Sequence, residues 1–343
     1  MALCGFSEAM TPHKHKLFVI VTFFLFLQKI SNKFLKKNHH NNKTEKMKHT
    51  LFLLAATMLL TVSCRNGNTQ AQTTETSKSP VITITTEDGV SLLLKDDKPM
   101  IFGLVDLANE MSKALFLGSY NDSLLNALMP TGASRSAINA FIVIDSSRTI
   151  LFDAGLGADK GGHLLENMKN AELDPAKVTA VCLTHLHTDH IGGLLQNGHA
   201  AFPNATLYLS QEEYDAWGDG GSMAKNNGLW KQVMAAYKGH IKTFHDGEKL
   251  FDGMVVAELA PGHTPGHTVY TVNGICLIAG DLLHTQDLQL DYPQFCARYD
   301  ADPEQATATR TRILKRVRDN GQYLAGAHCY DHFINLRDRN KEQ

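Results

Sequence analysis

The sequence has no excess of positive charge and no apparent internal repeat. Its 33 Lys and Arg residues face 35 Asp and Glu residues, so the chain has no large cationic field that would attract a polyanion. The stretch from residue 81 to residue 343 has the length of one α/β domain. These absences disfavour a nucleic-acid-binding protein and favour a soluble catalytic domain.

Cysteine pairs with metal-binding or redox spacing are also missing. None of the six cysteines lies in a Cys-x-x-Cys motif. Cys182 and Cys276 fall inside apolar runs of the kind found in buried strands. We therefore expect both side chains to act as small buried hydrophobic groups.

The first 46 residues hold no apolar run long enough to span a bilayer comfortably. Residues 17–27 are apolar, but they number only eleven, and a spanning helix needs about 20. Residues 1–46 are therefore interpreted as an over-extended start, with Met47 as the true initiator, or as a membrane-proximal anchor.

A second apolar run follows the basic start Met47-Lys48-His49 and ends in a small residue before Cys64. This arrangement is typical of a secretory signal. Because of Cys64 it resembles a bacterial lipoprotein signal, although Thr61 departs from the leucine-like residue usual at that site. We predict a signal peptide over residues 47–64, a disordered tether over 65–80, and export to the periplasm or to the outer membrane through a lipid anchor. Ordinary secretion without lipid is the alternative.

The sequence does contain a dense group of metal-ligand side chains, between Thr184 and His190. Three imidazoles and a carboxylate in six residues are rarely found by chance. The preceding residues 178–183 are apolar and β-branched, which predicts a buried strand. Side chains two residues apart in an extended segment point the same way, so His185 and His187 can share one metal ion.

Asp189 and His190 follow where the chain turns, and a helix is expected through residues 191–195. Their side chains can then reach a second metal ion. Loops held by a rigid sheet are where α/β proteins gather functional side chains. Further candidates follow the strand-like runs at 254–257, 275–280 and 323–327, in order His263 and His267, then Asp281, then His328.

These motifs resemble, in the same order, the signature of the metallo-β-lactamase superfamily of hydrolases. They are His-x-His-x-Asp-His at 185–190, Gly-His-Thr-Pro-Gly-His at 262–267, Gly-Asp at 280–281 and Gly-x-His at 326–328. The resemblance covers residues 81–343, the expected catalytic domain. It implies an α/β fold, an αββα sandwich of two mixed β-sheets flanked by helices.

The resemblance also implies roles for single residues. One metal ion would be held by His185, His187 and His263, and Asp281 would bridge to a second. His267 would support the site through hydrogen bonds. The second ion would be held by Asp189, His190 and His328.

Two other roles follow from position. Asp189 could also pass a proton to the leaving group. His284 lies three residues after Asp281 and either lines the pocket as a catalytic residue or is an ordinary loop histidine. Flavodiiron oxidases, which resemble this family, usually have a carboxylate where this chain has His187, so His187 favours zinc-like hydrolytic chemistry over oxygen chemistry. The whole ligand set leads us to expect two divalent metal ions, with zinc preferred.

The segment from Gly280 to Asp302 resembles the methyl-parathion-hydrolase-like branch, whose neighbourhood includes lactonases. True two-zinc β-lactamases commonly have a cysteine where this chain has Asp281, which disfavours antibiotic hydrolysis. We expect a hydroxide held by two metal ions to cleave a small lactone, carboxylester or phosphotriester. The alternatives are a glyoxalase-II-like thioester hydrolase, a di-iron oxidoreductase on the same fold, and a non-catalytic metal-binding lipoprotein. The exact substrate and the oligomeric state stay open.

Helices are expected at three places outside the ligand motifs, namely residues 164–172, 211–217 and 303–318. Two of them have capping signals. Ser210 is followed by Glu213 three residues later, and Asp302 is followed by a proline at the first helical position.

Overall fold

The computed structural model describes residues 82–85, 90–94 and 99–338. The expected extension at 1–46, the signal at 47–64 and the tether at 65–80 lie outside the described residues. Export and lipid attachment therefore stay predictions. Within the part of the chain that is described, no helix combines the length and apolar character that a membrane span requires.

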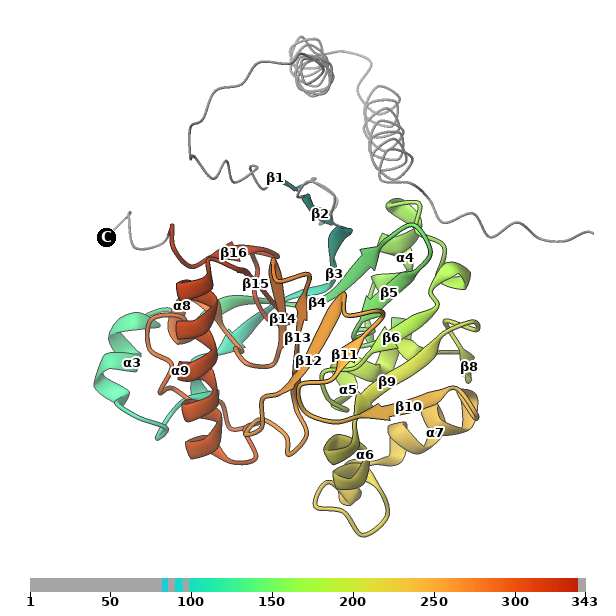
Figure 1. Cartoon of the computed structure of the whole chain (residues 1–343). Helices are drawn as coiled ribbons and strands as arrows, with labels where there is room; N and C mark the ends of the chain where they lie inside the picture. The colour runs from blue at the N-terminus through green and yellow to red at the C-terminus, as the bar shows by residue number, and fades with distance from the viewer. Residues whose placement is uncertain (1–81, 86–89, 95–98, 339–343) are drawn as a thin grey trace, which may run out of the picture. The chain divides into compact units, whose positions relative to one another are not determined.

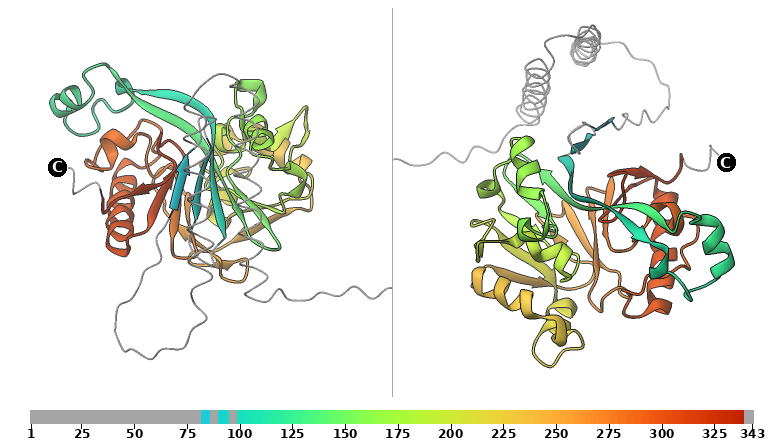
Figure 2. Two further views of the ribbon diagram at one scale, coloured as in Figure 1. Left: turned by 90° about the horizontal axis from the view of Figure 1, so that it is seen from above. Right: turned by 180° about the vertical axis from the view of Figure 1, so that it is seen from behind.

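Two mixed β-sheets form the centre of the described fold, and helices lie on their outer sides (Figures 1 and 2). This is the αββα arrangement that the sequence predicts. The first sheet is antiparallel from its first to its fifth strand and parallel beyond. In spatial order its strands are β1 Ile82–Thr85, β2 Val90–Leu94, β3 Met100–Ser112, β4 Ala133–Ile144, β5 Thr149–Phe152, β6 Ala180–Cys182, β9 Thr206–Ser210 and β10 Ile241–Phe244.

The second sheet is antiparallel except for one parallel pair, β14 with β15. Its strands are β11 Lys249–Leu250, β12 Val255–Leu259, β13 Thr268–Val272, β14 Cys276–Gly280, β15 Tyr323–Gly326 and β16 Ile334–Asn335. A two-stranded ribbon of β7 Leu195–Gln196 and β8 His199–Ala200 stands apart from both sheets. Strands β4 and β5 form an antiparallel hairpin, with Phe141 opposite Phe152.

The main core lies between the two sheets, because alternate strand residues point inward from both of them. Phe152 of the first sheet and Tyr270 of the second meet with ring centroids 5.3 Å apart. Cys182 and Cys276 are fully buried in this core, which confirms their expected hydrophobic role. The other residues of β14 face the opposite way. Leu277 and Ala279 pack against the long C-terminal helix.

That helix, α9, runs over Pro303–Asn320 and covers the outer face of the second sheet (Figure 1). Its apolar stripe, which includes Ile313, Leu314 and Val317, supplies the second core cluster. The Asp302 side chain accepts the Gln305 N–H, as a helix N-cap should. Gly321 ends the helix with φ of 62°, a left-handed conformation that glycine adopts without strain.

The remaining helices are shorter. They are α3 Asp122–Leu128, α4 Leu164–Asn170, α5 Thr188–Ile191, α6 Gln211–Trp217, α7 Gly228–Ala236 and α8 Gln286–Gln289, together with 3-10 turns at Lys113–Leu115, Ala158–Lys160, Pro175–Lys177, Gly192–Leu194 and Ala224–Asn226.

Two helix predictions need correction. The helix expected over 164–172 ends at Asn170, and Glu172 beyond it has φ of 58°. The helix expected through 191–195 instead begins at Thr188 and becomes a 3-10 turn at Gly192. A Cβ at Gly192 would lie only 2.0 Å from the Leu156 carbonyl oxygen, so this turn is set by close backbone packing rather than by helix propensity.

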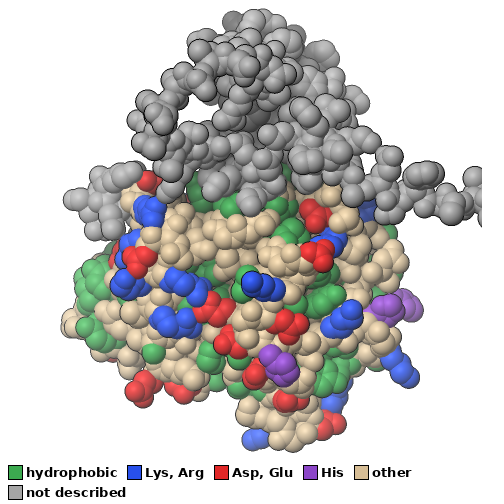
Figure 3. All heavy atoms as spheres, in the orientation of Figure 1, with side chains coloured by type: hydrophobic (Ala, Val, Ile, Leu, Met, Phe, Trp, Pro, Cys, Tyr) green, Lys and Arg blue, Asp and Glu red, His purple; other side chains and the backbone are tan. Residues whose placement is uncertain are grey.

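A long hairpin, β3–β4, extends past the sheet and carries α3 at its tip (Figure 2). There Phe116 and Leu125 pack against Phe295, in the segment that follows β14. On the face shown in Figure 3, Lys and Arg side chains are interspersed with Asp and Glu, as the balanced composition suggests.

Candidate metal centre

The four segments that carry the expected ligands each follow a strand. His185 to His190 follow β6, His263 follows β12, Asp281 follows β14 and His328 follows β15. The structure brings all seven side chains together in two groups. Within each group, the possible ligand atoms lie within 4.8 Å of one another. The first group is His185, His187, His263 and Asp281, and the second is Asp189, His190 and His328. Their role as ligands stays a prediction, but the convergence that it requires is present.

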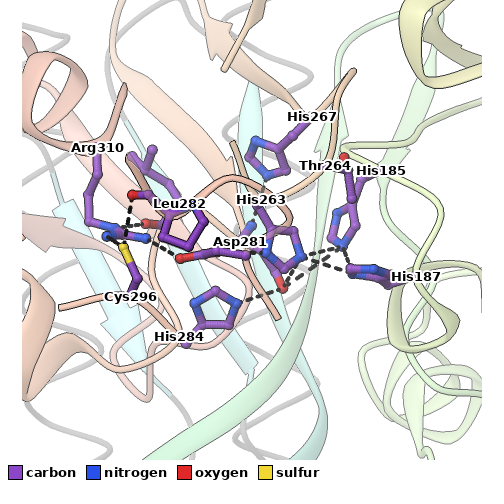
Figure 4. A network of polar contacts seen from close by, with 12 residues as sticks. His185, His187, His263, Thr264, His267, Asp281, Leu282, His284, Cys296 and Arg310 are labelled. Atoms are coloured by element: carbon purple, nitrogen blue, oxygen red, sulfur yellow. Dashed lines mark hydrogen bonds and ion pairs between the residues drawn. The ribbon is translucent and has the colours of Figure 1, made fainter. Parts of the chain in front are cut away.

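The first group places three imidazole nitrogens in a triangle (Figure 4). His185 Nε2 lies 3.0 Å from His187 Nδ1 and 3.2 Å from His263 Nε2, and the last two atoms are 2.9 Å apart. Asp281 Oδ2 lies 3.3 Å from His263 Nε2. Zinc bound tetrahedrally at 2.0–2.1 Å has ligand atoms about 3.3 Å apart, so the spacing fits a metal ion of that size.

In His185 and His263, the ring nitrogen that points away from the triangle, Nδ1, is here called the outer nitrogen, and Nε2 the inner one. The hydrogen bonds of the outer nitrogens show why the inner nitrogens suit a cation. The Thr184 hydroxyl donates to Asp153 Oδ2 at 2.8 Å, so its oxygen accepts the His185 Nδ1–H at 3.0 Å. His263 Nδ1–H donates to Asp300 Oδ1 at 3.0 Å. In the neutral form of either ring, the inner nitrogen then carries a lone pair. Lone pairs that face one another favour a bound cation.

The second group lies against the same Asp281 carboxylate. His190 Nε2 lies 3.0 Å from Asp281 Oδ1, and His328 Nε2 lies 3.2 Å from Asp281 Oδ2. Asp189 Oδ2 is 3.5 Å from His328 Nε2. The outer nitrogens are again fixed, His190 Nδ1 by Asp153 at 2.8 Å and His328 Nδ1 by the Ala137 carbonyl at 2.8 Å.

Burial and charge set the protonation of these groups. Burial lowers the pKa of His187 to about 4, with help from His263. Burial opposes ionisation of Asp281, yet His328 and His190 hold its pKa well below the usual range. Conversely, burial would lower the pKa of His328, but Asp281 and Asp189 raise it to about 9. Metal binding at the second group must therefore displace protons.

His267 lies outside both groups and has the supporting place expected for it. Its Nε2 accepts the Asp281 backbone N–H at 3.0 Å, and its Nδ1–H donates to the Ala260 carbonyl at 3.1 Å. Gly280 allows this contact, because a Cβ there would lie 2.7 Å from His267 Nε2. His267 therefore fixes the backbone that carries the shared carboxylate.

His284 is buried beside the centre, as the pocket-lining interpretation predicts. Its Nε2 is 3.6 Å from Asp281 Oδ2, and its ring stacks at 5.8 Å on His328. The ring of Tyr299, which is 52% exposed, lies 5.9 Å away. Neither ring nitrogen of His284 has a hydrogen-bond partner among the described residues. Its ligand atoms also group with His263 and Asp300, but the hydrogen bond between those two explains that proximity.

The sequence analysis missed three carboxylates that hold ligands or their loops. Asp153, directly after β5, accepts hydrogen bonds from His190 and Thr184, and its backbone is left-handed, with φ of 56°. Asp300 bonds His263 and forms a buried ion pair with Arg310 at 3.1 Å. Glu213, treated only as part of a helix cap, is fully buried. An acidic residue after a strand was a usable signal for Asp153, whereas the other two had none.

Comparisons with known proteins agree with this geometry. The family model described as the metallo-beta-lactamase superfamily matches residues 133–335, more than half of the chain. N-acyl homoserine lactonase AttM of Azorhizobium caulinodans is 31% identical over 133 residues, 35% of this chain and 47% of AttM. The chain thus spans about half the length of that relative. The probable metallo-hydrolase YqgX of Bacillus subtilis is 30% identical over 159 residues, 45% of this chain and 69% of YqgX.

Solved structures show the same fold. Hydrolase AbOPH superposes with a TM-score of 0.65 and 29% identity, covering 73% of this chain and 94% of that one. The dizinc quorum-quenching lactonase AidC superposes with a TM-score of 0.61 at 24% identity, covering 75% and 93%. These similarities agree with the lactonase-like branch predicted from the sequence. With its fold, its ordered motifs and the family match in agreement, the chain belongs to the metallo-beta-lactamase superfamily.

Proposed function

We propose that the protein is a hydrolase that uses two divalent metal ions, with zinc the best fit to the donor set. The observation that carries the proposal is the position of Asp281, whose carboxylate faces both ligand groups, with Oδ1 3.0 Å from His190 Nε2 and Oδ2 3.3 Å from His263 Nε2. Imidazole nitrogens and carboxylates are the ligands that zinc prefers. When bound, two such ions would act as Lewis acids and bring the pKa of a shared water toward neutrality.

The protein's own residues would supply orientation and proton transfer. Asp189 has a quarter of its side chain exposed, so its carboxylate could take the proton that the attacking water loses and pass it to the leaving group. Burial lowers the pKa of His284 to about 3, which keeps its imidazole neutral. Because neither nitrogen has a hydrogen-bond partner among the described residues, His284 can hydrogen-bond a substrate beside Asp281.

The proposed substrate is a small uncharged ester, with lactones first. The AttM relatives are named as N-acyl homoserine lactonases, and the wall of the centre near His284 includes the exposed ring of Tyr299. An aromatic ring at the rim suits an apolar substituent better than a charged one. Aryl esters and phosphotriesters are the next candidates.

The test is a hydrolysis panel on zinc-loaded protein with lactones, carboxylesters, phosphotriesters and acyl-glutathione thioesters. Cleavage of lactones or aryl esters is expected. Activity confined to the thioesters would favour the glyoxalase-II-like alternative, and no turnover of any class would contradict the hydrolase proposal. Metal analysis of purified protein tests the di-iron alternative, which requires iron and redox activity.

A further inference from the structure

Glu213 makes four hydrogen bonds from a fully buried position on α6. Its Oε1 accepts the Leu186 N–H at 3.0 Å and the Trp217 Nε1–H at 2.7 Å. Its Oε2 accepts the Thr264 hydroxyl at 2.8 Å and the Gly266 N–H at 3.0 Å. Hydrogen bonds to an ionised carboxylate are about twice as strong as neutral ones, so this side chain ties its donors together firmly.

This arrangement differs from the helix cap that the sequence suggests. Ser210 caps α6 by accepting the Glu213 N–H at 3.1 Å, as expected. In a full capping box, the Glu213 carboxylate would reach back to the backbone N–H of Ser210. Here the carboxylate is directed instead at groups on other segments.

Three of the four donors lie on the two loops that carry the first ligand group. Leu186 stands between His185 and His187 in the sequence, and Thr264 directly follows His263. The separations between Glu213 and its partners are 27 residues for Leu186 and 51 for Thr264. One side chain therefore spans the gap between the loops.

The backbone contact between α6 and the second loop is equally close. A Cβ at Gly266 would lie 2.1 Å from the Glu213 nitrogen, so only glycine permits this approach. Trp217, the fourth donor, places its ring edge-on to the His187 ring at 5.6 Å. The helix thus contacts both ligand-bearing loops through backbone, carboxylate and indole.

We infer that Glu213 is the positioning residue of the first metal group. It fixes the loop of His185 and His187 against the loop of His263, at the separation where the three ring nitrogens lie 2.9–3.2 Å apart. Without it, the two loops would lose their common anchor and the nitrogens their spacing. The inference rests on the two-metal site of the proposed function and is tested by metal binding, without substrate.

The informative variant is Glu213→Gln, which keeps the side-chain shape. The amide oxygen can still accept from Leu186 and Trp217. The amide NH₂, however, faces the Gly266 N–H. Because both groups are donors, this hydrogen bond is lost. We expect zinc titration of the metal-free protein against a chelator to show one of two ions bound about 10–100-fold more weakly, the range typical for groups that orient metal ligands. The other ion should keep its affinity.

Asp106→Asn is the matched control. Asp106 is also a buried carboxylate that accepts two loop amides, those of Leu156 and Leu164, at 2.8 Å each. Neither loop carries an expected ligand of the first group. The control should lower the unfolding temperature of the metal-free protein while leaving unchanged the affinity for the ion that Glu213→Gln weakens.

Two results would overturn the inference, namely unchanged binding of both ions by Glu213→Gln, or equal weakening by Asp106→Asn. If Glu213→Gln fails to fold, Thr264→Val removes one donor in a nearly isosteric way and should weaken the same ion by a smaller factor. Unchanged binding by Thr264→Val would then count against the inference. Wild-type protein that binds two ions but cleaves no ester contradicts only the proposed function, whereas wild-type protein that binds none contradicts both.

Discussion

Asp281 is the residue on which both ligand groups depend, because its carboxylate contacts imidazoles of both groups, His263 of the first and His190 and His328 of the second. We expect Asp281→Ala to abolish turnover and to weaken metal retention by more than about 100-fold, beyond the usual effect of changing a group that only orients a ligand. Zinc content after dialysis and ester hydrolysis are the measurements. Full activity in metal-stripped wild-type protein, or with one tightly bound ion, would rule out the two-metal mechanism.

His284 lies beside Asp281, and neither of its ring nitrogens has a hydrogen-bond partner among the described residues. We expect His284→Ala to change turnover or the preference among lactones, carboxylesters and phosphotriesters, while metal content stays at the wild-type level. His245→Ala, at an exposed histidine, is the control and should behave like wild type. Identical kinetics for His284→Ala on all three ester classes would make His284 a bystander.

At the scale of elements, the docking of α9 on the second sheet is a source of stability distinct from the metal centre. Ile313 is fully buried against that sheet. Ile313→Ala should cost about 2–5 kcal/mol of unfolding free energy, measured by urea denaturation, with zinc stoichiometry unchanged. Lys315→Ala, at a position 75% exposed on the same helix, should cost almost nothing. Equal effects of the two substitutions would contradict the packing described for α9.

At the scale of the whole molecule, the proposed export concerns residues outside the described ranges. If Met47 is the initiator and Cys64 the lipid site, the mature protein begins at Cys64 and partitions with membranes. Cys64→Ala should then block lipid attachment and leave hydrolysis of the released protein unchanged. Cys4→Ala is the matched control, because Cys4 precedes the predicted start. Intact-mass analysis that finds residues 1–63 on native protein would refute the processing.

The candidate ligands could be named from the sequence because each stands in a short local motif to which the family resemblance assigns a role. His185 and His187 share a spacing of two in an extended segment, and His263, Asp281 and His328 each follow an apolar run that proved to end near a strand terminus. The two mixed sheets followed from the same runs and from the family resemblance. Helix ends were less well predicted. The helix that begins at Thr188 gives way to a 3-10 turn at Gly192 because of close backbone packing there, which helix propensity does not predict.

The groups that hold the ligands in place were decided by the tertiary structure alone. Asp153 meets His190 across 37 residues, and Glu213 meets Thr264 across 51. The hydrogen-bond partners of a carboxylate depend on which loops the folded sheets bring within about 3 Å of it. The spacing of residues along the chain does not predict these partners. The sequence by itself therefore determines which residue types the centre contains, through its local motifs. Their arrangement into one site is decided by the tertiary structure, because the strand ends that carry them converge only in the folded chain.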